Sequence, residues 1–145
     1  MIIAIDFDGT CVAHDYPNIG KDIGAVPVIK DWVQRGHKII LLTMRDGKEF
    51  EAAKNWFKTF EIPLYGANEN PDQKNWVKTN KIFANMYIDD AALGCPLRVD
   101  PMISIKPFVD WNQVKIMFDE IENGIKPFGN TTAHKSIVEE KNGKS

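Results

Sequence analysis

The chain has 145 residues, of which 43% are hydrophobic and 26% are charged, and its formal net charge is −2. This length suits one domain, which can bury roughly 68–70% of the surface of its unfolded chain. The small negative charge excludes a broad positive field for nucleic acid or an anionic membrane. No apolar run approaches the roughly 20 residues of a membrane-spanning helix, and the N-terminus lacks the features of a signal peptide. We therefore expect a cytoplasmic protein, with its two cysteines as reduced thiols.

Short apolar runs alternate with helical patterns in the first half of the chain. Residues 1–5 form an apolar run without a turn residue, which predicts a buried strand. Residues 23–35 have a helical pattern that tolerates Pro27 in its first turn and ends at Gly36. The sequence "HKIILLT" at 37–43 predicts a second buried strand.

The alternation continues in the second half. Residues 47–60 carry apolar side chains at helical spacing, which predicts an amphipathic helix. A short strand at 62–67 and a short helical piece at 75–79 follow, and then a fourth strand at 84–90 that ends in carboxylates. A weak strand at 102–105 precedes a last helix, whose apolar stripe runs from Trp111 to Ile121.

This alternation predicts an α/β fold, a Rossmann-like three-layer sandwich with a central parallel sheet. We assign residues 1–125 to one catalytic domain. Residues 126–145 lose the apolar period, and we expect them to form a flexible tail.

Acidic residues follow the first buried strand in the stretch "IDFDGT", residues 5–10. A charged side chain at the end of a buried strand is costly unless it is paired with an opposite charge or bound to a metal. A turn or capping role would explain one aspartate, but not both Asp6 and Asp8 on either side of the apolar Phe7.

Polar residues also follow the other predicted strands. In an open parallel sheet the carboxyl ends of the strands share one edge, where ligands bind. Thr43, Asn68 and the pair Asp89 and Asp90 therefore converge with the first two aspartates. Four carboxylates so close would repel one another unless a cation lay among them, and a set of oxygen ligands favours Mg²⁺.

The four segments resemble the motifs of the haloacid dehalogenase superfamily of phosphotransferases. The motif "DFDGT" is specific, and a strand ending "LLT", a lysine and a strand ending "YIDD" follow in the expected order. More narrowly, "KIFANMYIDD" and "PFVDW" resemble its small capless phosphatases. The resemblance covers residues 1 to about 121.

The resemblance implies a role for each matching residue. Asp6 matches the nucleophile that forms an aspartyl-phosphate, and Asp8 matches the general acid and base. Thr43 matches the hydroxyl that hydrogen-bonds the transferring phosphoryl group. Asp90 matches a direct metal ligand and Asp89 its neighbour, bound through water, and the backbone carbonyl of Asp8 would also reach the metal.

Two lysines compete for the role of neutralising the phosphoryl group. Lys81, just before the fourth strand, fits the spacing of the narrower family, and we favour it over Lys74 on the preceding helical piece. Either residue has a plain alternative as a solvated surface lysine.

Three further polar residues at this edge have two readings each. Arg45 either binds a substrate anion or belongs to a plain turn in which Asp46 caps the next helix. Asn68 either contacts substrate or simply forms a turn. His14 lies in a segment, residues 11–21, where the superfamily places a mobile flap, and we expect it to be an exposed histidine.

The sequence leaves no room for a cap domain between residues 10 and 23 or between 67 and 82. We therefore predict a capless, Mg²⁺-dependent phosphomonoesterase with an open site, which suits a phosphorylated small molecule or a bulkier substrate. A partner subunit of a homo-oligomer is an alternative source of a lid. The competing functions are a 3′-phosphatase or nucleotidase acting on nucleic-acid ends, and a non-catalytic phosphate-binding regulatory module.

Overall fold

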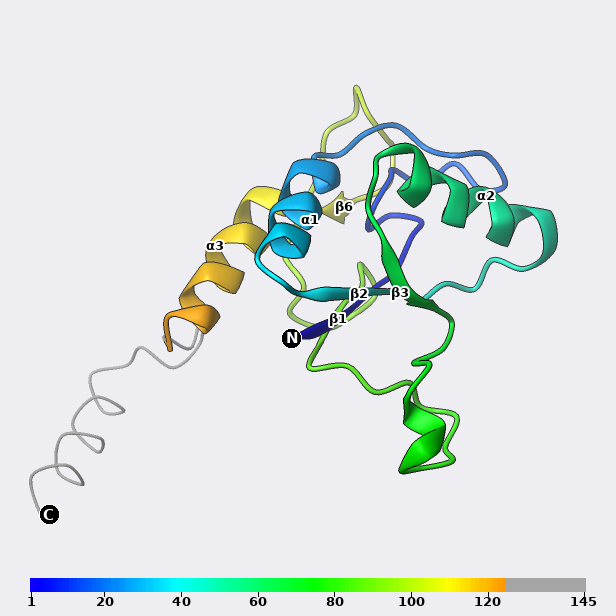
Figure 1. Cartoon of the computed structure of the whole chain (residues 1–145). Helices are drawn as coiled ribbons and strands as arrows, with labels where there is room; N and C mark the ends of the chain where they lie inside the picture. The colour runs from blue at the N-terminus through cyan, green and yellow to red at the C-terminus, as the bar shows by residue number, and fades with distance from the viewer. Residues whose placement is uncertain (125–145) are drawn as a thin grey trace, which may run out of the picture. The chain divides into compact units, whose positions relative to one another are not determined.

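We describe residues 1–124 of the chain in a computed structural model (Figure 1). The chain divides into two compact units, Met1–Trp111 and Asn112–Ser145, and each is described by itself. The tail predicted at residues 126–145 lies outside the described residues.

The first unit is built on a four-stranded parallel sheet. Its strands are β1 (Ile2–Ile5), β2 (Lys38–Leu41), β3 (Leu64–Ala67) and β4 (Met86–Ile88), in the spatial order β3-β2-β1-β4. Ile5, the last residue of the central strand β1, aligns with Leu41 of β2 and with Ile88 of β4. The predicted α/β fold with a central parallel sheet is confirmed, and the arrangement is consistent with a Rossmann-like three-layer sandwich.

Two helices cover one face of this sheet. The helices α1 (Ala25–Gln34) and α2 (Gly47–Thr59) are the crossovers from β1 to β2 and from β2 to β3. Both crossovers step in the same direction along the sheet, so right-handed connections place both helices on the same face, as Figure 1 shows. The largest fully buried side chains of these two helices are Trp32 of α1 and Phe57 of α2.

An irregular segment covers part of the other face. Ala4 and Ile40 form a cluster there with Ala84, which lies in the segment between β3 and β4. The helical piece predicted at 75–79 is wrong, since the structure has only a short 3₁₀ helix, η1 (Gln73–Asn75). The Gln73 side chain donates to the carbonyl of Lys81 and accepts from the N–H of Phe83, so it satisfies backbone groups of the irregular segment that leads into β4.

A small antiparallel hairpin stands beside the loop that follows β1. It consists of β5 (Leu97–Arg98) and β6 (Phe108–Val109), and the Val109 N–H donates to the carbonyl of Gly9 at 3.0 Å. The strand predicted at 102–105 is wrong. The backbone there turns, because the Asp100 carboxylate accepts the N–H of Met102 and the Asp100 carbonyl accepts those of Ile103 and Ser104.

The last helix of the described chain is α3 (Trp111–Glu122). Its predicted apolar stripe is buried at Trp111, Val114 and Phe118, but Ile121 is 39% exposed. No helix within residues 1–124 is both long enough and apolar enough to cross a membrane.

Candidate functional site

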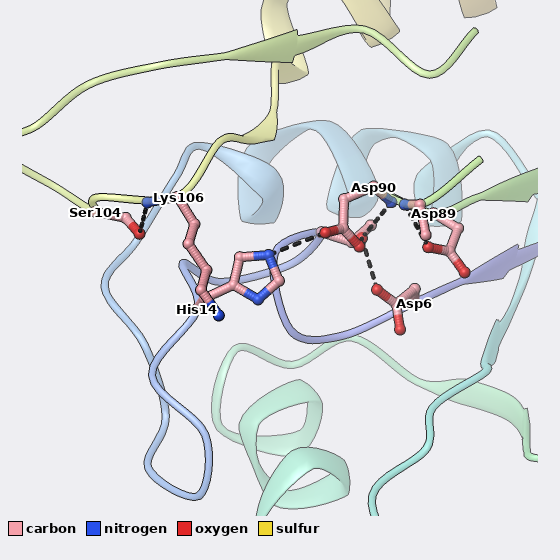
Figure 2. A network of polar contacts seen from close by, with 8 residues as sticks. Asp6, His14, Asp89, Asp90, Ser104 and Lys106 are labelled. Atoms are coloured by element: carbon pink, nitrogen blue, oxygen red, sulfur yellow. Dashed lines mark hydrogen bonds and ion pairs between the residues drawn. The ribbon is translucent and has the colours of Figure 1, made fainter. Parts of the chain in front are cut away.

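Asp6, Asp89 and Asp90 meet at the carboxyl edge of the sheet (Figure 2). Since Ile5 is aligned with Ile88, the residues that follow these strands are neighbours, and the Asp6 N–H donates to the Ile88 carbonyl at 2.9 Å. Each of the three aspartates offers one carboxylate oxygen, and these three oxygens lie within 4.8 Å of one another. The strand register therefore produces a cluster that can hold a metal ion.

A buried hydroxyl lies within this cluster. Thr10 is fully buried, and its Oγ1 lies 2.8 Å from Asp6 Oδ2 and 3.3 Å from Asp90 Oδ1. The same oxygen accepts the Asp90 N–H at 3.0 Å. Because a hydroxyl has one proton, Thr10 donates to one carboxylate at a time. Our sequence reasoning did not assign Thr10 to the site, although its place at the end of the "DFDGT" motif was an available signal.

The surroundings of Asp6 favour the protonated form of its carboxyl group. Burial raises the pKa of Asp6 from 3.8 to about 7, the negative charge of Asp89 and a hydrogen bond with Asp90 add to the rise, and the Thr10 hydrogen bond opposes it. The cluster therefore has more negative charge than its protein surroundings stabilise, and either a proton or a cation can relieve this.

Asp8 takes no part in that cluster. Its carboxylate forms a two-pronged ion pair with Arg45, in which Nε donates to Oδ2 and Nη2 donates to Oδ1, both at 2.7 Å. The Arg45 side chain is 1% exposed and that of Asp8 is 21% exposed. The two aspartates of the motif thus have different environments: Asp6 faces carboxylates, and Asp8 faces a guanidinium.

Two further hydrogen bonds of Arg45 hold the loop after β1. Nη2 donates to the carbonyl of Asn18 at 2.6 Å, and Nη1 donates to that of Pro17 at 3.2 Å. The hydrogen bonds with Asp8 raise the pKa of the Arg45 guanidinium. The structure thus gives Arg45 a contact that neither sequence reading included. Binding of a substrate anion by Arg45 stays a prediction.

Thr43 and Asn68 lie together at the ends of β2 and β3. The Asn68 amide accepts the Thr43 N–H at 2.8 Å and donates to the Thr43 carbonyl at 2.9 Å, so it ties the two strand ends together. The Thr43 hydroxyl oxygen accepts the N–H of Arg45 at 3.1 Å. Asn68 adopts φ 53°, which asparagine tolerates better than most residues.

The two candidate lysines are both exposed. The Lys81 Nζ lies 5.8 Å from the centre of the Tyr87 ring, beside the edge strand β4. Lys74 lines a cavity of about 490 Å³ together with Asn68. The role of Lys81 stays a prediction.

The expectation of an exposed His14 is wrong. Its side chain is 28% exposed, and Nε2 lies 2.9 Å from Asp90 Oδ2 (Figure 2). Gly9 makes this approach possible, because a Cβ atom at Gly9 would lie 2.1 Å from His14 Nε2 and 2.6 Å from Asp90 Oδ2.

The prediction that the two cysteines are reduced thiols is confirmed, since Cys11 and Cys95 are both free.

One solved structure resembles this chain in both sequence and fold. It is a conserved protein from Bacteroides thetaiotaomicron, with 32% sequence identity and a TM-score of 0.68, and the match covers 83% of this chain and 90% of that one. The chain belongs to the same family as this protein. No protein-family model matches the sequence, and no curated protein does.

The residues of the site determine which chemistry it can perform. Three carboxylates can bind a hard cation, and Asp8 with its guanidinium partner stands two residues along the chain from Asp6. The β5–β6 connection provides a further positive group, because the Lys106 side chain extends toward His14 in Figure 2. A cation bound by the three carboxylates, together with these positive side chains, suits the binding of an anion.

Proposed function

We propose that the protein is a Mg²⁺-dependent phosphomonoesterase of the haloacid dehalogenase kind, which acts through an aspartyl-phosphate on Asp6. The observation that carries this proposal is the cluster of Asp6, Asp89 and Asp90 at the carboxyl edge of β1 and β4. The specific "DFDGT" motif supplies both the first member of the cluster and Asp8.

The three carboxylates fit a magnesium ion. Hard oxygen ligands are those that Mg²⁺ prefers, and the raised pKa of Asp6 indicates that the cluster lacks positive charge. Asp6, Asp89 and Asp90 would hold the ion, with the backbone carbonyl of Asp8 as a further ligand that the family resemblance implies. A bound Mg²⁺ would polarise the phosphoryl group and screen its charge from the carboxylates.

The first step would transfer the phosphoryl group to Asp6. A carboxylate oxygen of Asp6 attacks phosphorus, a new O–P bond forms, and the bond from phosphorus to the alcohol oxygen breaks. The Thr10 hydrogen bond orients Asp6 for this attack. Since the Thr43 oxygen accepts the Arg45 N–H, the hydroxyl proton of Thr43 remains able to donate to a phosphoryl oxygen.

The second step would hydrolyse the aspartyl-phosphate with Asp8 as general base. Asp8 accepts a proton from water, and the water oxygen attacks phosphorus and releases Asp6. Both oxygens of Asp8 face Arg45, an arrangement that suits the charged carboxylate and hence the base role. To protonate the leaving alcohol in the first step, Asp8 has to loosen one of these hydrogen bonds.

Hydrolysis of an aryl phosphate tests this proposal. We expect phosphate release with Mg²⁺ and none in excess chelator, and a panel of phosphorylated metabolites, nucleotides and 3′-phosphorylated oligonucleotides would identify the substrate class. The control is Asp15→Asn, because Asp15 is an exposed residue of the same loop. Full activity in excess chelator, or no activity on any member of the panel, would contradict the proposal.

A further inference from the structure

We infer that His14 is a positioning residue that holds Asp90 in place and thereby sets the affinity of the carboxylate cluster for a divalent cation. This inference rests on the proposed function and adds to it a residue outside the motifs. His14 would not touch the substrate or the reacting atoms.

The contacts of Asp90 carry the argument. His14 Nε2 lies 2.9 Å from Asp90 Oδ2, whereas Oδ1 has only a contact of 3.3 Å with Thr10 Oγ1, whose single proton has the shorter contact with Asp6. The Asp90 N–H is also bound, since it donates to the Thr10 oxygen. A charged carboxylate only accepts hydrogen bonds, so the contact pairs the charged form of Asp90 with a His14 ring that has a proton on Nε2.

The backbone is built to allow this contact. Gly9 has φ +80°, and any side chain there would collide with both His14 and Asp90. The Gly9 N–H donates to the Val12 carbonyl at 2.7 Å, which closes the turn that brings His14 back over the cluster. The histidine is therefore held by the same tight turn that carries Asp6 and Asp8.

A second anchor fixes the loop on which His14 lies. Arg45 donates to the carbonyls of Pro17 and Asn18, three and four residues after His14. The guanidinium is almost fully buried, so this anchor is firm. The segment from 11 to 21 therefore contacts the site at two places, at Asp90 through His14 and at Asp8 through Arg45.

Residues that hydrogen-bond to a metal-binding side chain have a known effect on metal sites. They fix the orientation of the ligand before the metal arrives, and their removal typically costs 10–100-fold in metal affinity. Without His14, one oxygen of Asp90 would lose its partner and the side chain could rotate away from Asp6 and Asp89. The free energy of binding would then have to include the cost of ordering Asp90.

The test compares the Mg²⁺ dissociation constants of the folded proteins by titration calorimetry. We expect His14→Ala to bind Mg²⁺ roughly 10–100-fold more weakly than the wild type. His14→Gln should recover much of the affinity, because its amide can donate to the same oxygen. The matched control is His37→Ala, since His37 contacts the N-terminal amine at the opposite edge of the sheet.

A second readout separates positioning from catalysis and from folding. At saturating Mg²⁺, kcat of His14→Ala should return to within a few-fold of the wild type, whereas a catalytic histidine would leave kcat low. Equal Mg²⁺ affinities for the wild type and His14→Ala would overturn the inference alone. If the wild type bound no Mg²⁺, the proposed function would fail and the inference with it. If His14→Ala did not fold, His14→Leu would replace it, because leucine also lacks a donor and fills more of the space of the imidazole ring. Wild-type affinity for Mg²⁺ in His14→Leu would then overturn the inference.

Discussion

Arg45 binds both oxygens of Asp8 through two hydrogen bonds of 2.7 Å, at a position where the arginine side chain is 1% exposed. The pair joins the end of β2 to the turn after β1, and Arg45 extends it to the carbonyls of Pro17 and Asn18. One guanidinium therefore orients the proposed general base and shapes the loop over the site.

Removal of Arg45 should destabilise the protein. In Arg45→Met, Asp8 keeps its charge without a partner, and the two loop carbonyls lose their donors. We expect a loss of about 3 kcal/mol in the free energy of unfolding, at the low end for a broken buried pair because Asp8 is partly exposed. Chemical denaturation measures this loss, with Lys48→Met as the control, since the Lys48 side chain is 91% exposed. Equal stability of the two variants would contradict the expectation.

The conservative variant Arg45→Lys separates orientation of Asp8 from substrate binding. Lysine keeps the charge but lacks the planar fork that binds both carboxylate oxygens. If Arg45 orients Asp8, kcat should fall about 10–100-fold while KM changes little, since base catalysis is worth roughly 10²–10⁴-fold in total. A raised KM with unchanged kcat would instead favour the substrate-anion reading of the sequence.

Metal binding should depend on pH through Asp6. Its pKa in the folded protein, about 7, lies above its ordinary value of 3.8. The protonated acid therefore stabilises the metal-free fold, fully below about pH 3.8, and this contribution is lost as the pH rises through 7. The melting temperature of the metal-free protein should fall over this range.

Mg²⁺ should restore stability where the proton is lost. A ligand at 100 times its Kd stabilises the folded state by roughly 2.7 kcal/mol, and Mg²⁺ binds the charged form of Asp6. The rise in melting temperature with Mg²⁺ should thus be larger at about pH 8 than at about pH 5. Asp6→Asn should flatten the dependence, and an unchanged profile in this variant would assign the pH effect to another group.

The two lysine candidates give opposite expectations. If Lys81 neutralises the phosphoryl group, Lys81→Ala should remove most activity, roughly 100-fold or more, and Lys74→Ala should leave it nearly intact. Lys81 lies over the Tyr87 ring, so it would have to swing from this position to reach a phosphoryl group. The reverse result, with Lys74→Ala inactive, would transfer the role to the cavity that Lys74 and Asn68 line.

Most of the fold could be predicted from the sequence because its signals are local. The apolar runs of β1 and β2 and the periodic patterns of α1 and α2 identify their own elements. The segment between β3 and β4 could not be predicted in this way. Its path depends on Gln73, whose side chain binds backbone groups eight and ten residues further along the chain.

The acidic cluster could also be predicted, since parallel strands bring their carboxyl ends to one edge. The pairing of Asp8 with Arg45 and of Asp90 with His14 could not, because the partners are 37 and 76 residues apart. The loop after β1 determines which residues at the carboxyl edge of the sheet contact one another. Gly9 sets the turn of this loop, and Arg45 binds its far side. No periodic pattern records such contacts.

Substitution of the two aspartates of the motif should separate the two chemical steps. Asp6→Asn removes the attacking oxygen, so we expect neither turnover nor a covalent intermediate, with a loss of at least about 1000-fold. Asp8→Asn keeps the attacking group and removes the proposed base. An aryl phosphate has a good leaving group that needs little proton assistance, whereas attack by water still needs the base.

The Asp8→Asn protein should therefore be slow overall and yet accumulate phosphate on Asp6. Acid quench followed by mass spectrometry would reveal one added phosphoryl group, and peptide mapping would locate it. Asp8→Asn also weakens the ion pair with Arg45, so its fold has to be checked by thermal melting before the kinetics are compared. Ordinary turnover by Asp6→Asn, or phosphate trapped on any side chain other than Asp6, would show that the nucleophile is assigned wrongly.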